Sequence, residues 1–124
     1  IDTEVTALND RITTEVTGLN NRITTEIGAI NAAVSNNAAQ ISRNSEHIEE
    51  NRRGIAMVAA MTNTAVLAGN TSALDINLSY FEDEVGLGAG YGHKLSEQTQ
   101  IHAALSTTTD FDEVAGRVGV SYQW

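Results

Sequence analysis

The sequence predicts a membrane β-barrel joined to a coiled coil, with one long helix in the first half of the chain and four antiparallel strands in the second half. Two observations lead to this prediction. Apolar residues recur at helical spacing as far as about residue 53, and they alternate with small or polar residues from about residue 72 onward. The composition changes between these two parts, since Gly and Ala become frequent and basic residues become rare after Gly54.

The overall composition excludes several kinds of protein. The 124 residues include 7 Lys and Arg, 16 Asp and Glu, and no Cys or Pro. This negative balance argues against a nucleic-acid partner, which requires a basic face. Without Cys, the chain has no disulfide framework and no thiol ligands for a metal. No signal peptide is present, and the helical pattern has already started at the first residue, so we expect a fragment of a longer protein.

Residues 1–33 form three consecutive units of eleven residues. Three helical turns in eleven residues correspond to about 3.67 residues per turn, which favours a straight or slightly right-handed supercoil. The apolar row of this repeat comprises Ile1, Val5, Leu8, Ile12, Val16, Leu19, Ile23, Ile27, Ile30 and Val34. Because Arg11 precedes Glu15 and Arg22 precedes Glu26 by four residues, we expect each pair to interact on the helix surface.

From Val34 the repeat changes to heptads. The a positions hold Val34, Ile41, Ile48 and Ile55, and the d positions hold Asn37, Asn44, Asn51 and Val58. An Asn in the seam of a coiled coil costs stability and usually fixes register and oligomeric state. A helix with such a narrow apolar stripe requires identical neighbours for stability, and the alternative is a solitary solvated helix.

The second half contains four segments in which apolar residues occupy alternate positions. The alternating apolar residues are Leu74, Ile76, Leu78 and Tyr80, then Val85, Leu87, Ala89, Tyr91 and Leu95, then Ile101, Ala103 and Leu105, and last Val114, Val118, Val120, Tyr122 and Trp124. His93 is the one polar residue in this series. Each segment has about ten residues, which is the length of a tilted strand that crosses a bilayer. We expect turns at Glu82–Glu84, at Ser96–Gln98 and from Thr107 to Glu113.

The two faces of the predicted sheet differ in character. The apolar face carries aromatic residues near the strand ends, namely Tyr80, Tyr91, Tyr122 and Trp124, as expected for a lipid-facing surface with an interfacial belt. The opposite face carries the alternating glycines Gly86, Gly88, Gly90 and Gly92. Glycine weakens a strand, so this row is expected where another backbone approaches closely. The alternative is a soluble sheet with one packed face, but the chain offers no second layer to cover it.

Four strands leave two open edges, which are not tolerated in lipid, and small outer-membrane barrels have at least about eight strands. Three chains would close a barrel of twelve strands, and the pattern alone does not exclude four chains with sixteen. The helical segment Gly54–Asn63 is too short and too interrupted to span a membrane, so we expect it to lie inside the barrel against the glycines.

The direction of the chain supports this placement, because an even number of strands begins and ends on the same side of a membrane. A stalk on the other side must then reach the first strand through the pore. The predicted domains are therefore a trimeric coiled-coil stalk in 1–53, a pore-traversing helix and linker in 54–71, and a β-barrel segment in 72–124. Within the linker, we expect Thr64 to Thr71 to form the turn from helix to strand.

With these features, the whole chain resembles the C-terminal translocator and membrane-anchor domain of the trimeric autotransporter adhesins of Gram-negative bacteria. The residues that carry the resemblance are the Ile-x-x-Asn layers at Ile41–Asn44 and Ile48–Asn51, the Gly/Ala-rich helix Gly54–Ala60, the four strands, and the final residues Gly119–Trp124. A departure is the linker after Asn63, which lacks the Pro often present there.

The resemblance implies a type V secretion system in the outer membrane. Three chains would form a twelve-stranded barrel, an adhesive passenger with a role in virulence would be exported through it to meet a host ligand, and the stalk would remain in the pore and at the cell surface. The resemblance also implies that an anion, chloride, binds between the side chains of Asn37, Asn44 and Asn51. It further implies that Tyr122 and Trp124 form the signal that the barrel-assembly machinery recognises.

No arrangement of residues predicts an enzyme, because no nucleophile is paired with a base. His47, His93 and His102 lack the spacing of metal ligands. The glycines at 86–90 lie in a strand pattern and open no helix, so they do not predict a phosphate loop.

The acidic turns offer one further candidate site. The residues Asp110, Asp112 and Glu113 could hold Ca²⁺, although a solvated loop is the simpler interpretation. Together with Glu82–Glu84 they would ring the outer mouth of the barrel.

The alternative function is that of a soluble trimeric fibre segment that ends in a β-cap. Such a cap would turn the apolar face inward and would need no aromatic belt.

Overall fold

The computed structural model describes residues 1–124 and contains one helix and four strands. Helix α1 spans Asp2–Ala60, and the strands are β1 (Ser72–Phe81), β2 (Glu84–Lys94), β3 (Thr99–Thr108) and β4 (Val114–Tyr122). The chain divides into two compact units, Ile1–Ser45 and Glu46–Trp124. The first unit is purely helical, and the second holds the end of α1, the linker 61–71 and the sheet.

In the first unit, threonine-rich repeats remain helical although Thr has a low intrinsic helix propensity. Its hydroxyl groups donate hydrogen bonds to carbonyls four residues earlier, from Thr6 to Asp2, from Thr14 to Asp10 and from Thr25 to Asn21. These bonds satisfy the hydroxyls within the helix itself. All residues of the apolar row are exposed in the single chain. The apolar stripe of the eleven-residue repeat is therefore not buried by this chain alone.

The two predicted surface ion pairs of this unit are confirmed. Arg11 and Glu15 lie 4.0 Å apart, as do Arg22 and Glu26. All four side chains are about three-quarters exposed, so each pair contributes at most about 0.5 kcal/mol.

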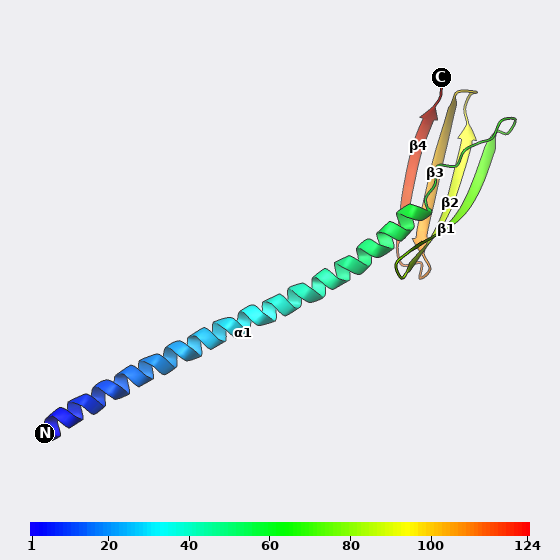
Figure 1. Ribbon diagram of the computed structural model, residues 1–124. Helices are drawn as coiled ribbons and strands as arrows, with labels where there is room; N and C mark the ends of the chain where they lie inside the picture. Colours follow the sequence, from blue (N-terminus) through cyan, green and yellow to red (C-terminus); the bar gives the residue numbers. More distant parts are fainter. The chain divides into compact units, whose positions relative to one another are not determined.

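The second unit contains an antiparallel meander with strand order β1-β2-β3-β4, which confirms the four predicted strands (Figure 1). The register pairs Leu78 with Leu87, Gly92 with His102, and His102 with Gly119. Strands β1 and β4 lie at the ends of this order, and each has one edge without a partner strand.

The turns differ slightly from the prediction. Glu84 belongs to β2, because it pairs with Phe81 and leaves only Glu82 and Asp83 in the first turn. Thr107 and Thr108 belong to β3, since Thr107 pairs with Val114 of β4. The sequence placed these three residues in turns because they are polar, but polar side chains suit the ends of a strand equally well.

The predicted alternation of faces is confirmed by the burial of the side chains. In β2 the glycines are buried, and in the second half of the strand they alternate with exposed residues. In β3 the residues His102, Ala104, Ser106 and Thr108 are buried. The face that carries these residues is called the inner face here, and the opposite, apolar face is called the outer face.

The last turns of α1 and the linker run along the inner face from one end of the sheet to the other (Figure 1). Ala56, Met57 and Ala60 of α1 and Thr64 and Val66 of the linker are buried there. The helix ends at Ala60, earlier than the helical propensity up to Asn63 indicated. Thr62 and Asn63 have polar side chains that bond to the sheet, which favours an extended chain over another helical turn. No part of α1 is both long and apolar enough to cross a membrane.

Candidate functional site

The outer face of the sheet is a continuous apolar surface without any cover in the single chain. Ile76, Val118 and Tyr80 are 79%, 84% and 72% exposed. Most other apolar residues of this face are also exposed, and Val85 and Leu87 are half-buried. Soluble monomers rarely expose apolar patches larger than a few hundred Å², and larger ones mark interaction with proteins or membranes. The outer face is therefore a candidate contact surface.

Polar groups on the outer face occur at one end of β1 and β2. The Ser72 hydroxyl lies 3.1 Å from the Tyr91 hydroxyl and 2.8 Å from Nδ1 of His93. The rings of Tyr91 and His93 stack with centroids 6.4 Å apart. His93, the one polar residue in the apolar series, thus has a hydrogen-bond partner for its Nδ1 atom and stacks on Tyr91 near the strand ends.

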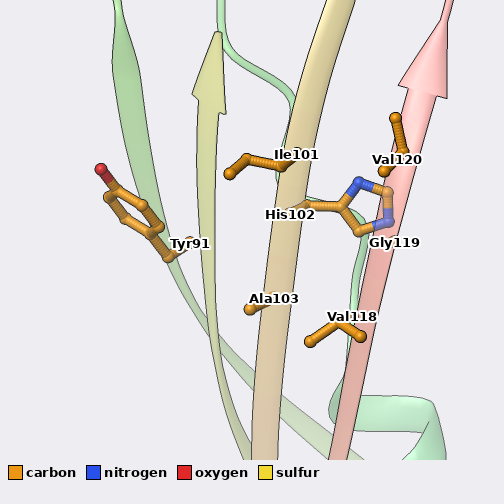
Figure 2. A pocket seen from close by; sticks show the side chains of 7 residues that line it. All are labelled: Tyr91, Ile101, His102, Ala103, Val118, Gly119 and Val120. Carbon is orange, nitrogen blue, oxygen red and sulfur yellow. The ribbon is translucent and has the colours of Figure 1, made fainter. Parts of the chain in front are cut away.

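A hollow of about 540 Å³ on the outer face lies between β2, β3 and β4 and is lined mainly by apolar residues (Figure 2). The hollow also borders His102, whose side chain belongs to the inner face, and Figure 2 shows its imidazole extending from β3 toward Gly119 of β4. A Cβ atom at Gly119 would overlap Nε2 of His102, so the glycine provides the space that the ring fills. The ring serves as a packing group, and no other metal-ligating side chain accompanies it.

On the inner face, three of the four glycines of β2 lie directly against the main chain of α1 and the linker, and the fourth, Gly90, lies against the Thr64 hydroxyl. A Cβ at Gly86 would lie 2.6 Å from the carbonyl carbon of Ala56, and one at Gly88 would lie 2.7 Å from that of Ala60. A Cβ at Gly92 would lie 2.6 Å from the carbonyl oxygen of Thr64. The expected close approach of another backbone is therefore present. That this face lines a pore stays a prediction.

Side chains from three strands hold the linker on the inner face. Asn77 of β1 donates a hydrogen bond of 2.9 Å to the Thr62 hydroxyl. Arg117 of β4 donates one of 2.5 Å to Oδ1 of Asn63. Gln100 of β3 donates to the Thr64 carbonyl and accepts from the Val66 amide, both at 3.3 Å.

Two adjacent arginines fasten α1 to both turns at one end of the sheet. Nε of Arg52 lies 2.6 Å from the Glu82 carboxylate in the β1–β2 turn. Both Nε and Nη2 of Arg53 lie 3.1 Å from Oε1 of Glu113 in the β3–β4 turn. The hydrogen bond to Glu113 raises the pKa of Arg53, burial partly offsets this, and nearby carboxylates add smaller increases. This role was not predicted from the sequence, although the adjacent arginines and the two acidic turns are visible in it.

Glu113, considered above as a Ca²⁺ ligand, instead pairs with Arg53. No three His, Asp or Glu side chains converge closely enough to hold a metal ion.

The remaining predicted site residues are exposed in the single chain. Asn37, Asn44 and Asn51 lie on the surface of α1, so the structure of one chain does not test the anion site. Tyr122 ends β4, and Trp124 is fully exposed, with its ring stacked on that of Tyr122 at 6.4 Å between centroids. Recognition of these two residues by an assembly machinery stays a prediction.

Comparison with solved structures gives an informative similarity. No family model matches the chain, and no curated protein does. Among solved structures, the chain is similar to the solid-state NMR structure of the membrane anchor domain of the trimeric autotransporter YadA, with a TM-score of 0.55 and 13% sequence identity. The match covers 68% of this chain and 82% of that chain. The predicted resemblance is thereby confirmed at the level of the fold: one helix followed by a four-stranded antiparallel meander, as in the membrane anchor domain of a trimeric autotransporter.

Proposed function

We propose that this chain is the outer-membrane anchor and translocation pore of a trimeric autotransporter adhesin. Three copies form one twelve-stranded barrel in the outer membrane of a Gram-negative bacterium. An adhesive passenger on the N-terminal side is exported through the barrel and then tethered at the cell surface by the coiled-coil stalk. Partners are two further copies, membrane lipid and the barrel-assembly machinery, and a host ligand is met only through the passenger.

One observation carries this proposal: the sheet exposes its apolar outer face while its inner face is occupied by the chain's own helix and linker. A soluble sheet would place the apolar face against a second layer. A surface that is apolar outside and small or polar inside is the pattern of a membrane barrel. Strands of nine to eleven residues extend about 30–36 Å, which suffices for a tilted strand to cross the hydrocarbon layer.

The two open edges support the oligomeric state. An unpaired strand edge in lipid leaves backbone N–H and C=O groups without partners, at several kcal/mol each. Pairing β4 of one copy with β1 of the next removes both edges at once, and three copies give a closed ring of twelve strands, within the range known for outer-membrane barrels. The fold similarity to a trimeric protein's anchor domain points in the same direction.

The experiment that tests this function is the oligomeric mass of the detergent-extracted chain, measured before and after heating. We expect a heat-resistant trimer before heating and a monomer after prolonged boiling. A monomer or dimer without heating would leave the strand edges unexplained, and solubility without detergent would favour the fibre segment with a β-cap.

We further propose that three Asn side chains in each of the layers 37, 44 and 51 bind chloride within the trimeric stalk. Amide N–H groups donate to anions, so the three Asn side chains of one layer can each donate a hydrogen bond to the same chloride ion. Crystals of the trimer grown in bromide should show anomalous signal on the three-fold axis at these layers. Layers filled only by Asn–Asn contacts would contradict the anion site.

A further inference from the structure

The linker at Thr62–Val66 lies extended on the inner face without any backbone-to-backbone hydrogen bond. The last such bond before it joins the Met61 amide to the Val58 carbonyl, and the next one joins Asn70 to Leu67. Buried backbone groups are nearly always paired, so those of this segment require partners from side chains. The structure supplies such partners at one place.

Gln100 is the residue that pairs with the linker backbone. Its Nε2 donates to the carbonyl oxygen of Thr64, and its Oε1 accepts from the amide of Val66, both at 3.3 Å. A side-chain amide has the same donor and acceptor as a peptide group, so Gln100 bonds to residues two apart as a neighbouring strand would. Neither bond involves a side chain of the linker.

Two glycines provide the surface on which this backbone lies. A Cβ at Gly92 would lie 2.6 Å from the Thr64 carbonyl oxygen and 3.3 Å from a methyl group of Val66. A Cβ at Gly90 would lie 3.6 Å from the Thr62 carbonyl oxygen and would overlap the Thr64 hydroxyl. A larger residue at Gly92 would therefore displace the extended chain, and one at Gly90 would displace the Thr64 side chain.

The Thr64 side chain shows that the fit depends on the backbone. Thr64 is fully buried, yet its hydroxyl has no hydrogen-bond partner. A site shaped for this particular side chain would satisfy the hydroxyl, because an unpaired buried polar group costs about 1–3 kcal/mol. The polar contacts at this position go to the main chain instead.

We propose that Gln100, Gly90 and Gly92 form a binding site for extended polypeptide that recognises the main chain and accepts different side chains. The linker occupies this site at rest. The inference rests on the proposed export function, and it adds that successive segments of the exported chain occupy the same site. Since an extended chain presents equivalent N–H and C=O groups every two residues, a moving chain can exchange one bonded position for the next.

The binding site is tested by amide hydrogen exchange in the assembled, detergent-extracted full chain. Gln100→Ala should increase the exchange rate at the Val66 amide about threefold to tenfold, which is the effect expected for a hydrogen bond of ordinary net strength. Gln98→Ala is the matched control, because Gln98 is exposed in the neighbouring turn and its side chain makes no hydrogen bond. Val66→Thr, which alters the side chain and keeps the amide, should retain the protection. Unchanged exchange in Gln100→Ala would overturn the site.

The role in export is tested by the rate at which a tagged passenger reaches the cell surface after a pulse of synthesis. Gln100→Ala should slow its arrival severalfold at equal amounts of assembled trimer. Val66→Pro removes the bonded amide from the resting linker and leaves Gln100 available to exported segments. The passenger should therefore reach the cell surface at its normal rate. Equal rates in Gln100→Ala and the unmodified chain would restrict the site to the linker and overturn its role for exported segments. Failure of the unmodified chain to export would count against the proposed function, while exchange at Val66 would still decide whether the site exists.

Discussion

Gly88 and Gly90 occupy equivalent positions on the inner face but differ in what an added side chain would meet. At Gly88 a Cβ would lie 2.7 Å from the Ala60 carbonyl carbon, which belongs to the backbone of α1 and cannot move alone. At Gly90 it would meet the Thr64 hydroxyl, and every other atom is at least 3.6 Å away. A side chain at Gly88 would therefore clash with main chain. A side chain at Gly90 would clash only with the Thr64 hydroxyl, which a substitution of Thr64 can remove.

This difference predicts which substitution can be rescued. Gly88→Ala should lower the free energy of unfolding of the detergent-extracted oligomer by about 1–3 kcal/mol, as overpacking usually does, and Gly88→Leu should block assembly or export. Gly90→Ala should also lower the free energy of unfolding of the oligomer, but the double variant Gly90→Ala/Thr64→Ala should recover most of the lost stability. Thermal denaturation of the alanine variants measures the changes in stability, and the yield of assembled oligomer measures the effect of Gly88→Leu.

The control is Gly28→Ala, because nothing lies within 4 Å of a Cβ at this helical position. It should stabilise the helix by up to about 1 kcal/mol. If Thr64→Ala rescued Gly88→Ala as well as Gly90→Ala, the contacts assigned to the two glycines would be wrong.

The role of a single residue could be predicted from the sequence where it depends on which face of a strand the residue occupies. It could not be predicted where it depends on which distant group a long side chain contacts. The sequence predicted that Gly88 faces a close backbone, because alternation in a strand fixes its face. It did not predict that Gln100 bonds to the linker, since a long polar side chain at a strand start has many equally plausible partners. That contact depends on how the linker and β3, which are remote in sequence, lie against each other in the folded chain.

At the scale of elements, α1 is joined to the sheet turns by the pairs Arg52–Glu82 and Arg53–Glu113. These side chains are between about a quarter and a half exposed, so each pair contributes on the order of 1 kcal/mol or less. Because they lie at the end of the sheet where α1 begins to cover the inner face, they hold the last turns of the helix in register with β2.

Charge reversal tests this attachment. Arg53→Glu and Glu113→Arg should each accelerate amide exchange in residues 54–60 of α1, and the double variant should restore much of the protection because the pair reforms with opposite polarity. The same reversal at Arg11 and Glu15, which are 76% exposed, is the control and should have almost no effect. Strictly additive effects at positions 53 and 113 would show that the two side chains do not act as a pair.

The elements themselves followed from periodicity, but their ends did not. Four strands and one long helix were predicted because each repeats its pattern over at least nine residues. The end of α1 at Ala60 was not predicted, because it depends on hydrogen bonds that the side chains of Thr62 and Asn63 form with β1 and β4. Local propensity contains no information on such distant partners.

At the scale of the molecule, Trp124 allows folding and the proposed recognition by the assembly machinery to be tested separately. It lies two residues after the end of β4, is fully exposed, and has its ring stacked on that of Tyr122. Deleting Trp124 should therefore leave the stability of the assembled barrel and the trimerisation of the stalk nearly unchanged, and it should slow membrane insertion severalfold. The measurement is the fraction of newly made chain that resists extraction of membranes with urea, followed over time. Trp124→Phe is the matched control and should insert at nearly the normal rate, whereas normal insertion of the deletion variant would refute the proposed signal.

The open edges of β1 and β4 have a genetic consequence. If a barrel closes only when three copies each supply both edges, one copy with a defective edge leaves the whole ring open. A cell that makes intact and defective copies in equal amounts, and assembles them at random, would build only about one fully intact barrel in eight. A Pro in the middle of β1 or β4 should therefore behave as a dominant allele.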